Sequence, residues 1–349
     1  MWEALVGVEV AELRIGLFTP WGVRCGIYTY SRDLAGALAK LGVEVYVCRM
    51  PRFGALTPEL VGLLVDKAPR DVDLYVVSHE YGLWKGLEGV FYPRLRSLGK
   101  PIVTIAHAVG KWDVDRVIAE YSDRVIVHNK YCHRKFGFKD KTVIIPHGCR
   151  VVDTPPEEEA KKALGIDPRI PIVGYLGFIS PYKGLEILIE AMREIPNAAL
   201  LIGGGWHAGP DTQYIGQLKQ LTLSVLPGRC QWLGYVPEER LATVYGSMRV
   251  FCYPSRYSTE SGALLTALGH GRAVIASDLP PFREKADEGA LWCFTDVDDL
   301  REKIERLLMD DVAREWLSFQ ALKYCREHSW GIVANKHKRL YEEVLDEDS

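Results

Sequence analysis

Short runs of apolar and β-branched residues alternate with helical stretches through almost the whole of this 349-residue chain. Short apolar runs of this kind are typical of strands that are buried on both faces of a parallel sheet. The alternation therefore predicts open, mainly parallel sheets with helices on both faces. Strands are expected at residues 14–18, 44–48, 74–78, 102–106, 124–127, 142–145, 172–177, 199–202, 230–233, 250–253, 273–276 and 290–294.

The chain is too long for one ordinary hydrophobic core, and its alternating pattern is interrupted once. Residues 151–160 contain a proline pair and then a run of glutamates, which is typical of a linker that leads into a helix. We therefore expect an α/β protein of two doubly wound, Rossmann-like domains, at residues 1–152 and 153–328. Ligands of such sheets bind beyond the carboxyl ends of the strands, so a cleft between the domains is the expected site. Residues 329–349 are expected to form a final helix that docks on one domain or the other.

Charge and hydropathy exclude several classes of partner. The formal net charge is −3 and charges of both signs are interleaved, which gives no reason to expect a nucleic-acid partner. No apolar run approaches the ~20 residues that span a bilayer, and residues 1–12 lack the basic cluster of a signal peptide. We therefore expect a cytoplasmic protein without a transmembrane segment, for which a peripheral membrane contact stays open.

Eight cysteines are scattered along the chain, and no two of them have the spacing of a zinc or redox motif. Buried, reduced thiols are therefore the preferred interpretation, and disulfides stay open for a chain from a hyperthermophile.

A Ser/Thr/Glu/Gly-rich elbow follows the expected strand at residues 250–253 and opens a short apolar helix. The free amides at such a helix start, near Ser261 and Gly262, can bind a phosphate, and Glu260 can bind a sugar hydroxyl beside it. Ser and Thr side chains that only cap the helix are the alternative interpretation.

The loop after the first expected strand contains Gly22 and Gly26 and leads directly into a helix. Glycines at these positions let the backbone approach a phosphate closely, although a plain strand-to-helix turn has the same composition. The loop has neither the G-x-G-x-x-G fingerprint of dinucleotide-binding proteins nor a P-loop, which disfavours an NAD-dependent oxidoreductase and a kinase.

Several residues with titratable side chains follow other expected strands. Lys183 can neutralise a phosphate leaving group, and His107 and His79 can bind a sugar hydroxyl or transfer a proton. A solvated lysine and core histidines are the alternatives, and His147 is interpreted as a turn residue.

Three Asp-x-Asp pairs can in principle hold a divalent metal. They lie before a strand or at helix starts, where aspartate caps helices, so no metal site is assigned to them. The pairs are Asp71 with Asp73, Asp113 with Asp115, and Asp296 with Asp298.

A series of short motifs runs along nearly the whole chain, at residues 22–30, 105–107, 143–148, 173–184, 200–205, 232–237, 253–255, 271–278 and 329–330. In order and spacing they resemble those of the family-4 retaining glycosyltransferases of the GT-B fold, the group of glycogen synthases and mannosyltransferases. The resemblance implies two Rossmann-like domains with a cleft between them, and a final helix at 329–349 that packs back on the first domain.

The resemblance also implies an activity. The enzyme would transfer a sugar from a UDP-, GDP- or ADP-linked donor to a sugar, lipid or small-molecule hydroxyl, with retention and without an obligatory metal or other cofactor. The first domain would bind the acceptor and the second the donor.

The same resemblance implies roles for individual residues. Lys183 would stabilise the leaving diphosphate, His107 would contact the donor sugar, and Glu260 would bind that sugar. The implied donor-binding residues are Gly22, Gly26, Gly177, Gly204, Ser261, Gly262 and Thr266.

The sequence departs from the family pattern at two places. Phe178 stands where the family has an arginine that shares the diphosphate with the lysine. Thr266 stands where a second glutamate binds the ribose, and Glu260 lies two places after the usual first glutamate, where Ser258 stands. Losing one charged contact to a leaving phosphate costs about 2–4 kcal/mol of barrier. Three alternatives stay open: Arg24 or Arg256 compensates for the missing arginine, the donor is a different one, or catalysis is weak.

Three functions of different kinds follow. A retaining glycosyltransferase is the leading hypothesis, and the two departures motivate the alternative of a non-catalytic or regulatory GT-B protein that binds a sugar or nucleotide. A GT-B phosphorylase or epimerase is the third, because fold does not determine function.

Overall fold

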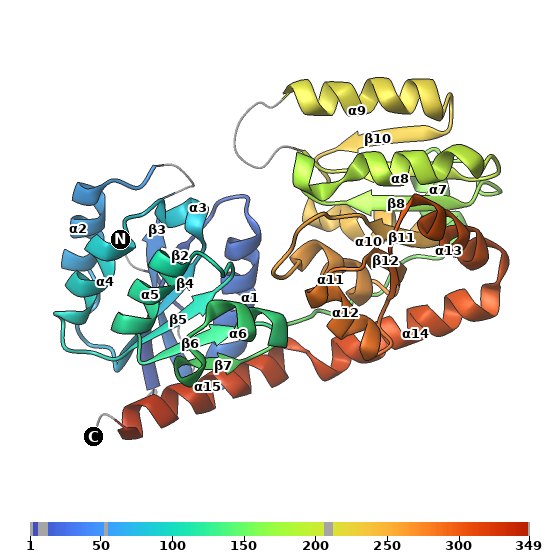
Figure 1. The fold of residues 1–349 in the computed structure, drawn as a ribbon. Helices are drawn as coiled ribbons and strands as arrows, with labels where there is room; N and C mark the ends of the chain where they lie inside the picture. Colours follow the sequence, from blue (N-terminus) through green and yellow to red (C-terminus); the bar gives the residue numbers. More distant parts are fainter. Residues whose placement is uncertain (1–2, 6–12, 52–54, 206–211, 348–349) are drawn as a thin grey trace. The chain divides into compact units, whose positions relative to one another are not determined.

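The computed structural model describes residues 3–5, 13–51, 55–205 and 212–347 (Figure 1). The chain divides into two compact units, Met1–Gly148 with His328–Ser349 and Cys149–Glu327. Each unit contains one mainly parallel sheet with helices on its faces. The doubly wound α/β fold that the alternating pattern predicts is therefore confirmed.

The first unit has a seven-stranded sheet in the order β1-β3-β2-β4-β5-β6-β7. All neighbouring strands pair in parallel except β1, which runs antiparallel to β3 at the edge. Among the described strands of this sheet, the pattern misses only the edge strand β1. The strands are β1 (Glu3–Leu5), β2 (Leu13–Pro20), β3 (Val43–Met50), β4 (Leu74–His79), β5 (Ile102–Ala106), β6 (Arg124–Val127) and β7 (Thr142–Ile144).

Four helices of the first unit start at a residue whose side chain accepts one of the free amides, whereas α4 and α5 have no such cap. Cys25, Thr57, Glu80 and Asn129 each accept a backbone N–H through the side chain and so begin a helix. The helices are α1 (Gly26–Ala39), α2 (Pro58–Asp66), α3 (Tyr81–Trp84), α4 (Glu88–Arg96), α5 (Trp112–Tyr121), α6 (Lys130–Phe136), the 3₁₀ turn η1 (Lys139–Lys141) and α15 (Trp330–Glu347).

The C-terminal helix α15 packs against α1 within the first unit. Its apolar stripe is buried, and His337 lies 3.2 Å from the Tyr30 hydroxyl of α1. Gly148 leaves room for the ring of Trp330, because a Cβ there would lie 2.3 Å from the ring.

The second unit has a six-stranded parallel sheet in the order β10-β9-β8-β11-β12-β13. The sheet reverses its order between β8 and β11, which is the switch point where open parallel sheets bind ligands. The strands are β8 (Ile172–Leu176), β9 (Ala199–Gly203), β10 (Cys230–Gly234), β11 (Val250–Tyr253), β12 (Ala273–Ser277) and β13 (Trp292–Phe294).

The helices and 3₁₀ turns of the second unit connect these strands. They are α7 (Glu157–Ala163), η2 (Pro181–Lys183), α8 (Leu185–Ala191), η3 (Met192–Glu194), α9 (Thr212–Val225), α10 (Glu238–Gly246), α11 (Gly262–Gly269), α12 (Pro280–Asp287), α13 (Val297–Met309) and α14 (Asp311–Glu327). None of the helices in the described ranges is long and apolar enough to cross a membrane.

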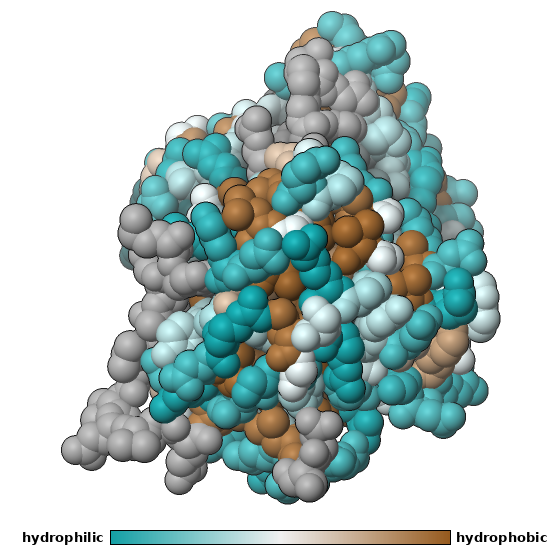
Figure 2. Space-filling view, turned by 90° about the vertical axis from the view of Figure 1, so that its left-hand side faces the viewer, coloured by the Kyte–Doolittle hydropathy of each residue, from teal (hydrophilic) through white to brown (hydrophobic). Residues whose placement is uncertain are grey.

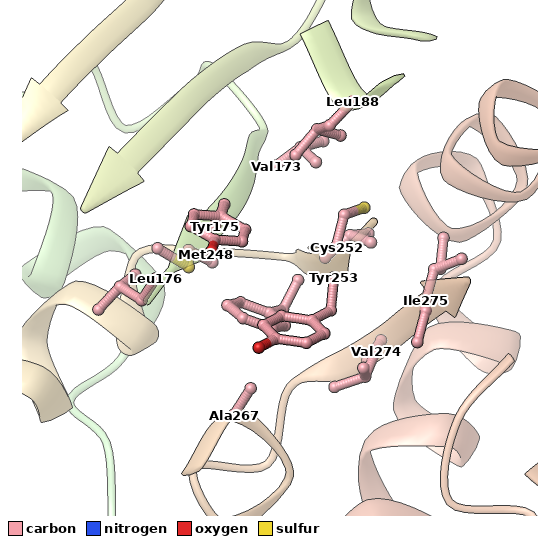
Figure 3. Close-up of a cluster of buried hydrophobic side chains, with 14 of the residues drawn as sticks. Val173, Tyr175, Leu176, Leu188, Met248, Cys252, Tyr253, Ala267, Val274 and Ile275 are labelled. Atoms are coloured by element: carbon pink, nitrogen blue, oxygen red, sulfur yellow. The ribbon is translucent and has the colours of Figure 1, made fainter. Parts of the chain in front are cut away.

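The core of the second unit is packed around aromatic rings on its central strands (Figure 3). The rings of Tyr175 on β8 and Tyr253 on β11 stack at 5.9 Å. Gly174 makes room for Met248, because a Cβ on this glycine would lie 2.1 Å from the Met248 sulfur. This packing fixes the ring of Tyr253 at the end of its strand.

The surface on the α2–α4 side of the first unit is mostly hydrophilic, with hydrophobic areas interrupted by polar residues (Figure 2). Leu63 of α2 and Val90 of α4 are exposed, and an ion pair between Asp66 and Arg94 links these two helices. Single exposed apolar residues among charges are ordinary for a protein surface.

We predict that Gly269→Ala destabilises the second unit by about 1–3 kcal/mol, the usual cost of overpacking. Gly269 ends α11, and a Cβ there would lie 2.0 Å from the carbonyl oxygen of Arg150, a backbone atom that cannot rotate away. Gly216→Ala in α9 is the matched control, because its Cβ meets nothing within 4 Å. The control should be neutral or stabilising by ~0.5–1 kcal/mol. Urea unfolding measures both, and equal stabilities of the two variants would contradict the prediction.

Candidate functional site

The residues proposed from the sequence lie in two groups, one in each unit. Most of these residues follow the strands at the switch point of their own sheet, between β2 and β4 in the first unit and between β8 and β11 in the second. His107 follows β5 and Gly204 follows β9, each one strand further from the switch point. Gly22, Gly26 and His107 belong to the first unit. Gly177, Lys183, Gly204, Glu260, Ser261, Gly262 and Thr266 belong to the second.

Lys183 ends the η2 turn that follows β8, and its ammonium lies between two aromatic rings. The Nζ donates a hydrogen bond to the hydroxyl of Tyr253 and lies 4.7 Å and 4.8 Å from the ring centres of Tyr182 and Tyr253. Burial lowers the pKa of Lys183, but the two phenols more than offset this, so the pKa is raised above its ordinary value. The ammonium is therefore a fixed positive charge at the switch point of the sheet.

The loop that carries Lys183 is in contact with the loop after β11. Gly184 has φ +63°, and a Cβ at this position would lie 2.3 Å from the carbonyl oxygen of Pro254. The amide of Arg256 donates to the Tyr182 carbonyl at 2.8 Å. Only glycine allows this close approach, which holds Lys183 against the end of β11.

Arg256 brings a second cationic side chain to the same place. Its guanidinium donates to the Pro181 carbonyl at 3.2 Å and pairs with Glu186 of α8. The side chain is half-exposed. The structure therefore places Arg256 beside the Lys183 loop, with its charge paired to Glu186.

Two glycines connect the loops after β8 and β9. A Cβ on Gly204 would lie 1.8 Å from the Gly177 carbonyl oxygen, and both glycines have positive φ, +137° and +156°. The Gly204 amide donates to Gly234 at 2.7 Å, and the Gly177 amide donates to Gly203 at 3.1 Å. Both glycines thus have a structural reason for their identity, which holds whether or not they contact a ligand.

The N-terminus of α11 follows the loop that contacts Gly184. The Ser261 hydroxyl caps it by accepting the Leu264 amide at 3.2 Å. The next amides, those of Gly262 and Ala263, have no acceptor within the helix by its geometry. Thr266 lies one turn further along and donates its hydroxyl to the Gly262 carbonyl at 2.8 Å. A short helix with a small first residue and two available amides is suited to an anion.

Glu260 is held in place by a buried partner that the sequence analysis did not find. Its Oε2 pairs with Nζ of Lys285 on α12 at 2.8 Å, and both side chains are almost fully buried. Its Oε1 accepts the Ser261 amide at 2.8 Å. Since this carboxylate already has two partners, it can serve a ligand only through its remaining lone pairs.

In the first unit, Gly22 and Gly26 lie at the start of α1 with open space before them. Gly22 has φ +71°, and a Cβ on either glycine would meet nothing within 4 Å. Cys25 caps α1 by accepting the Tyr28 amide at 3.3 Å, and burial raises the pKa of its thiol. The loop therefore presents backbone rather than a reactive thiolate.

His107 follows β5 and belongs to a cluster of rings around Tyr30. The Tyr30 ring lies 4.7 Å from His107, 5.2 Å from His128, 4.8 Å from His147 and 5.1 Å from Trp330. Burial lowers the pKa of His107 well below its usual value, and the neighbouring histidines lower it further. His107 is therefore neutral at physiological pH.

The hydrogen bonds of the cluster select one tautomer of His107. His128 Nδ1 lies 3.1 Å from the Ile145 carbonyl, which only accepts, so this nitrogen carries the proton. The Nε2 of a neutral His128 then accepts from His107 Nδ1 at 3.3 Å. The Nε2 of His107 is consequently a hydrogen-bond acceptor, which can receive a hydrogen bond from a hydroxyl donor.

Two other histidines have structural partners. His79 is fully buried and lies 2.9 Å from Glu88. His147 Nδ1 lies 2.7 Å from the Gly148 carbonyl.

The Asp-x-Asp pairs are likewise bonded to the chain itself. Asp73 accepts the Arg14 amide, Asp115 accepts from Tyr81 and Gly110, and Asp296 caps α13. The described part of the chain contains no disulfide and no group of three or more residues arranged to hold a metal ion.

Comparison with known proteins adds to this geometry. Residues 170–310 match the family described as Glycosyl transferases group 1. The chain is 30% identical over 215 residues to a phosphatidyl-myo-inositol mannosyltransferase of Mycobacterium tuberculosis, a match that covers 58% of this chain and 54% of the mannosyltransferase. The chain thus spans about half the length of this relative. It is 26% identical over 399 residues to an alpha-maltose-1-phosphate synthase of Mycolicibacterium smegmatis, covering 95% of this chain and all of that one.

Two solved structures are similar over almost the whole chain. Anabaena HepE in complex with UDP and glucose has a TM-score of 0.79 at 17% identity. The match covers 95% of this chain and 100% of the HepE chain. Sucrose-phosphate synthase from Thermosynechococcus elongatus has a TM-score of 0.80 at 21% identity. The match covers 96% of this chain and 100% of the synthase chain. At these identities the likeness shows the fold.

We predict that the stability of the first unit falls as the pH falls from about 6.5 towards 3, because it contains buried neutral histidines. Burial lowers the pKa of His337 to about 3. Below pH ~6.5 the unfolded chain binds a proton that the folded chain does not, at about 1.4 kcal/mol per pH unit for each such group. His337→Gln should therefore flatten the dependence of unfolding free energy on pH.

Tyr341→Phe is the matched control, because it removes the hydroxyl that bonds to His337 at 3.0 Å and keeps the imidazole. Urea unfolding at several pH values should give Tyr341→Phe the slope of the wild type. A slope unchanged in His337→Gln would show that this histidine is not the group that titrates.

Proposed function

We propose that this chain, whose residues 170–310 match the group 1 glycosyl transferases and whose fold is similar to those of HepE and sucrose-phosphate synthase, is a glycosyltransferase that uses a nucleotide-sugar donor. The observation that carries the proposal is the ammonium of Lys183, fixed between Tyr182 and Tyr253 at the switch point of the donor-side sheet. UDP is the first nucleotide to test, because the similar HepE structure contains it.

In this proposal the second unit stabilises the leaving diphosphate. Lys183 supplies a full positive charge, and the amides of Gly262 and Ala263 supply donors at a helix N-terminus. Arg256 supports the assignment, because it lies on the same pair of touching loops and takes the role of the arginine that Phe178 replaces. No metal is required where fixed cations carry this charge, so metal independence is part of the proposal.

Glu260 and His107 bind sugar hydroxyls in the proposal. The pair with Lys285 holds the Glu260 carboxylate at the start of α11, and its remaining lone pairs accept hydroxyl donors. The Nε2 of His107 accepts in the same way, because its tautomer is set by His128. We assign neither residue as a nucleophile, and transfer occurs with retention, the outcome that the family resemblance implies.

A non-catalytic GT-B protein is the second candidate. It is favoured by Phe178 and Thr266, and by the internal pairing of Glu260 with Lys285. Such a protein would bind the nucleotide sugar without turnover, so turnover separates the two candidates.

We predict that Lys183→Ala lowers kcat/KM for donor consumption by about 10²–10³-fold, because it removes the charge at the leaving group. Tyr253→Phe, which removes the hydroxyl that holds the ammonium, should lose less activity. Lys162→Ala is the matched control, since this lysine of the same unit is well exposed in a surface pair with Glu158. The assay measures release of UDP, GDP or ADP from the corresponding sugar donors in the presence of EDTA.

Turnover by Lys183→Ala at the rate of the wild type would contradict the assignment of this lysine. Binding without turnover in the wild type would favour the non-catalytic candidate. For retention, NMR of the product should show the anomeric configuration of the donor, and the opposite configuration would exclude it. Loss of activity in EDTA would exclude metal independence.

A further inference from the structure

Two of the eight cysteines lie against the same end of the helix α11 in the second unit. Leu265 and Gly269 are four residues apart on this helix and therefore share a face of it. The thiol of Cys325 on α14 donates to the Leu265 carbonyl at 4.0 Å, and a Cβ on Gly269 would lie 3.9 Å from the same sulfur. The Cys325 side chain is therefore packed onto this face of α11, where it is fully buried.

The segment that begins with Cys149 reaches the same place. The Cβ position of Gly269 that lies near the Cys325 sulfur is also 2.0 Å from the carbonyl oxygen of Arg150, and the Val152 amide donates to the Gly269 carbonyl at 2.9 Å. The side chain of Cys149 is hydrogen-bonded to that of Cys325, and it too is buried. The two thiols are therefore neighbours in the folded second unit.

The other cysteines of this unit are held too far apart to pair. Cys252 is on β11 and Cys293 is on β13, and β12 lies between these two strands. Neighbouring strands are about 4.8 Å apart, so the two Cα atoms are separated by roughly 10 Å, beyond the ~7 Å limit for a disulfide. Cys230 is on β10, at the opposite edge of the sheet from β13. Cys149 and Cys325 are thus the pair that this unit brings together.

The positions of the two cysteines in the chain give a bond between them a large effect. The second unit runs from Cys149 to Glu327, so Cys149 is its first residue and Cys325 lies close to its last. A covalent bond between them would close almost the whole unit into one loop. Cross-links that close long loops remove the most conformational freedom from the unfolded chain.

We propose that Cys149 and Cys325 are the two halves of a structural disulfide that joins the ends of the second unit, and that the structure shows its reduced form. The oxidant is a small disulfide such as oxidised glutathione. The Cys149 thiolate attacks it and releases one reduced glutathione, and the Cys325 thiolate then displaces the other from the mixed disulfide. One disulfide replaces another, and the two protein thiol protons end on two glutathione thiols.

Burial decides how fast this bond forms. The hydrogen bond to Cys325 and burial both raise the pKa of Cys149, so little thiolate is present while the segment is closed. Residues 150–156 form neither helix nor strand, so this segment can open locally without unfolding the sheet. Oxidation of the folded protein should therefore be slow, and the bond should be shielded from reductants once it has formed.

Peptide mapping after controlled oxidation tests the pairing. The wild type is incubated with oxidised and reduced glutathione at urea concentrations from zero to just below its unfolding midpoint, which increases local opening. Free thiols are then blocked with N-ethylmaleimide, and non-reducing mass spectrometry should find Cys149 linked to Cys325 as the main cross-link. Cys325→Ser should lack this cross-link. Cys252→Ser is the matched control and should keep it, because Cys252 is also fully buried.

Thermal unfolding tests the consequence of the bond. The oxidised wild type should melt about 5–15 °C above the reduced wild type, the usual gain from a disulfide in a unit of this size. The same oxidation should leave the melting temperature of Cys149→Ser unchanged, because this variant cannot close the loop. Differential scanning calorimetry measures all four samples.

Three results would overturn the proposal. The first is a wild type in which Cys149 and Cys325 stay reduced up to the unfolding midpoint, and the second is a different pair as the main cross-link. The third is a cross-linked protein that melts no higher than the reduced one. None of these measurements uses nucleotide or sugar transfer, so they are independent of the proposed function.

Discussion

The account depends on one close contact, between Gly184 and the carbonyl oxygen of Pro254. A Cβ at residue 184 would lie 2.3 Å from that oxygen, so the η2 loop can lie against the end of β11 only with glycine there. The contact brings the Lys183 ammonium onto the ring and hydroxyl of Tyr253, which stacking on Tyr175 holds in place. A flexible, exposed lysine thereby becomes a fixed charge. Its position at the switch point of the sheet connects the fold to the proposed chemistry.

The site residues of the second unit are ionised, whereas His107 of the first unit is neutral. This difference matches the roles proposed for the two units. The second unit fixes ionised groups: Lys183, which is proposed to bind the diphosphate, and the Glu260–Lys285 pair, whose carboxylate is proposed to bind a sugar hydroxyl. The first unit surrounds His107 with other rings and keeps it neutral, as suits a hydrogen bond to an uncharged hydroxyl. A neutral acceptor is also compatible with a nearby developing positive charge on a sugar, because it adds no repulsion.

The sequence was a good guide to the fold and to the positions of functional loops. Every predicted strand is present. A buried parallel strand can be predicted from a short stretch of sequence, because it consists of a run of apolar and β-branched residues. The partners of the site residues left no such local signal. Tyr253 is 70 residues from Lys183, and Lys285 is 25 residues from Glu260. His107 was proposed from its place after a strand, but the rings around Tyr30 come from several distant segments that only folding brings together.

The most direct test of the central claim is a calorimetric cycle between the lysine and the second phosphate of the ligand. The affinities of UDP and UMP, or of GDP and GMP if guanine is the preferred base, are measured for the wild type and for Lys183→Ala. The account predicts that the diphosphate binds the wild type more tightly than the monophosphate, and that most of this preference, about 1.5–3 kcal/mol for a charged hydrogen bond, is lost in the variant. The same preference for the diphosphate in both proteins would contradict the account, because Lys183 would then not contact that phosphate.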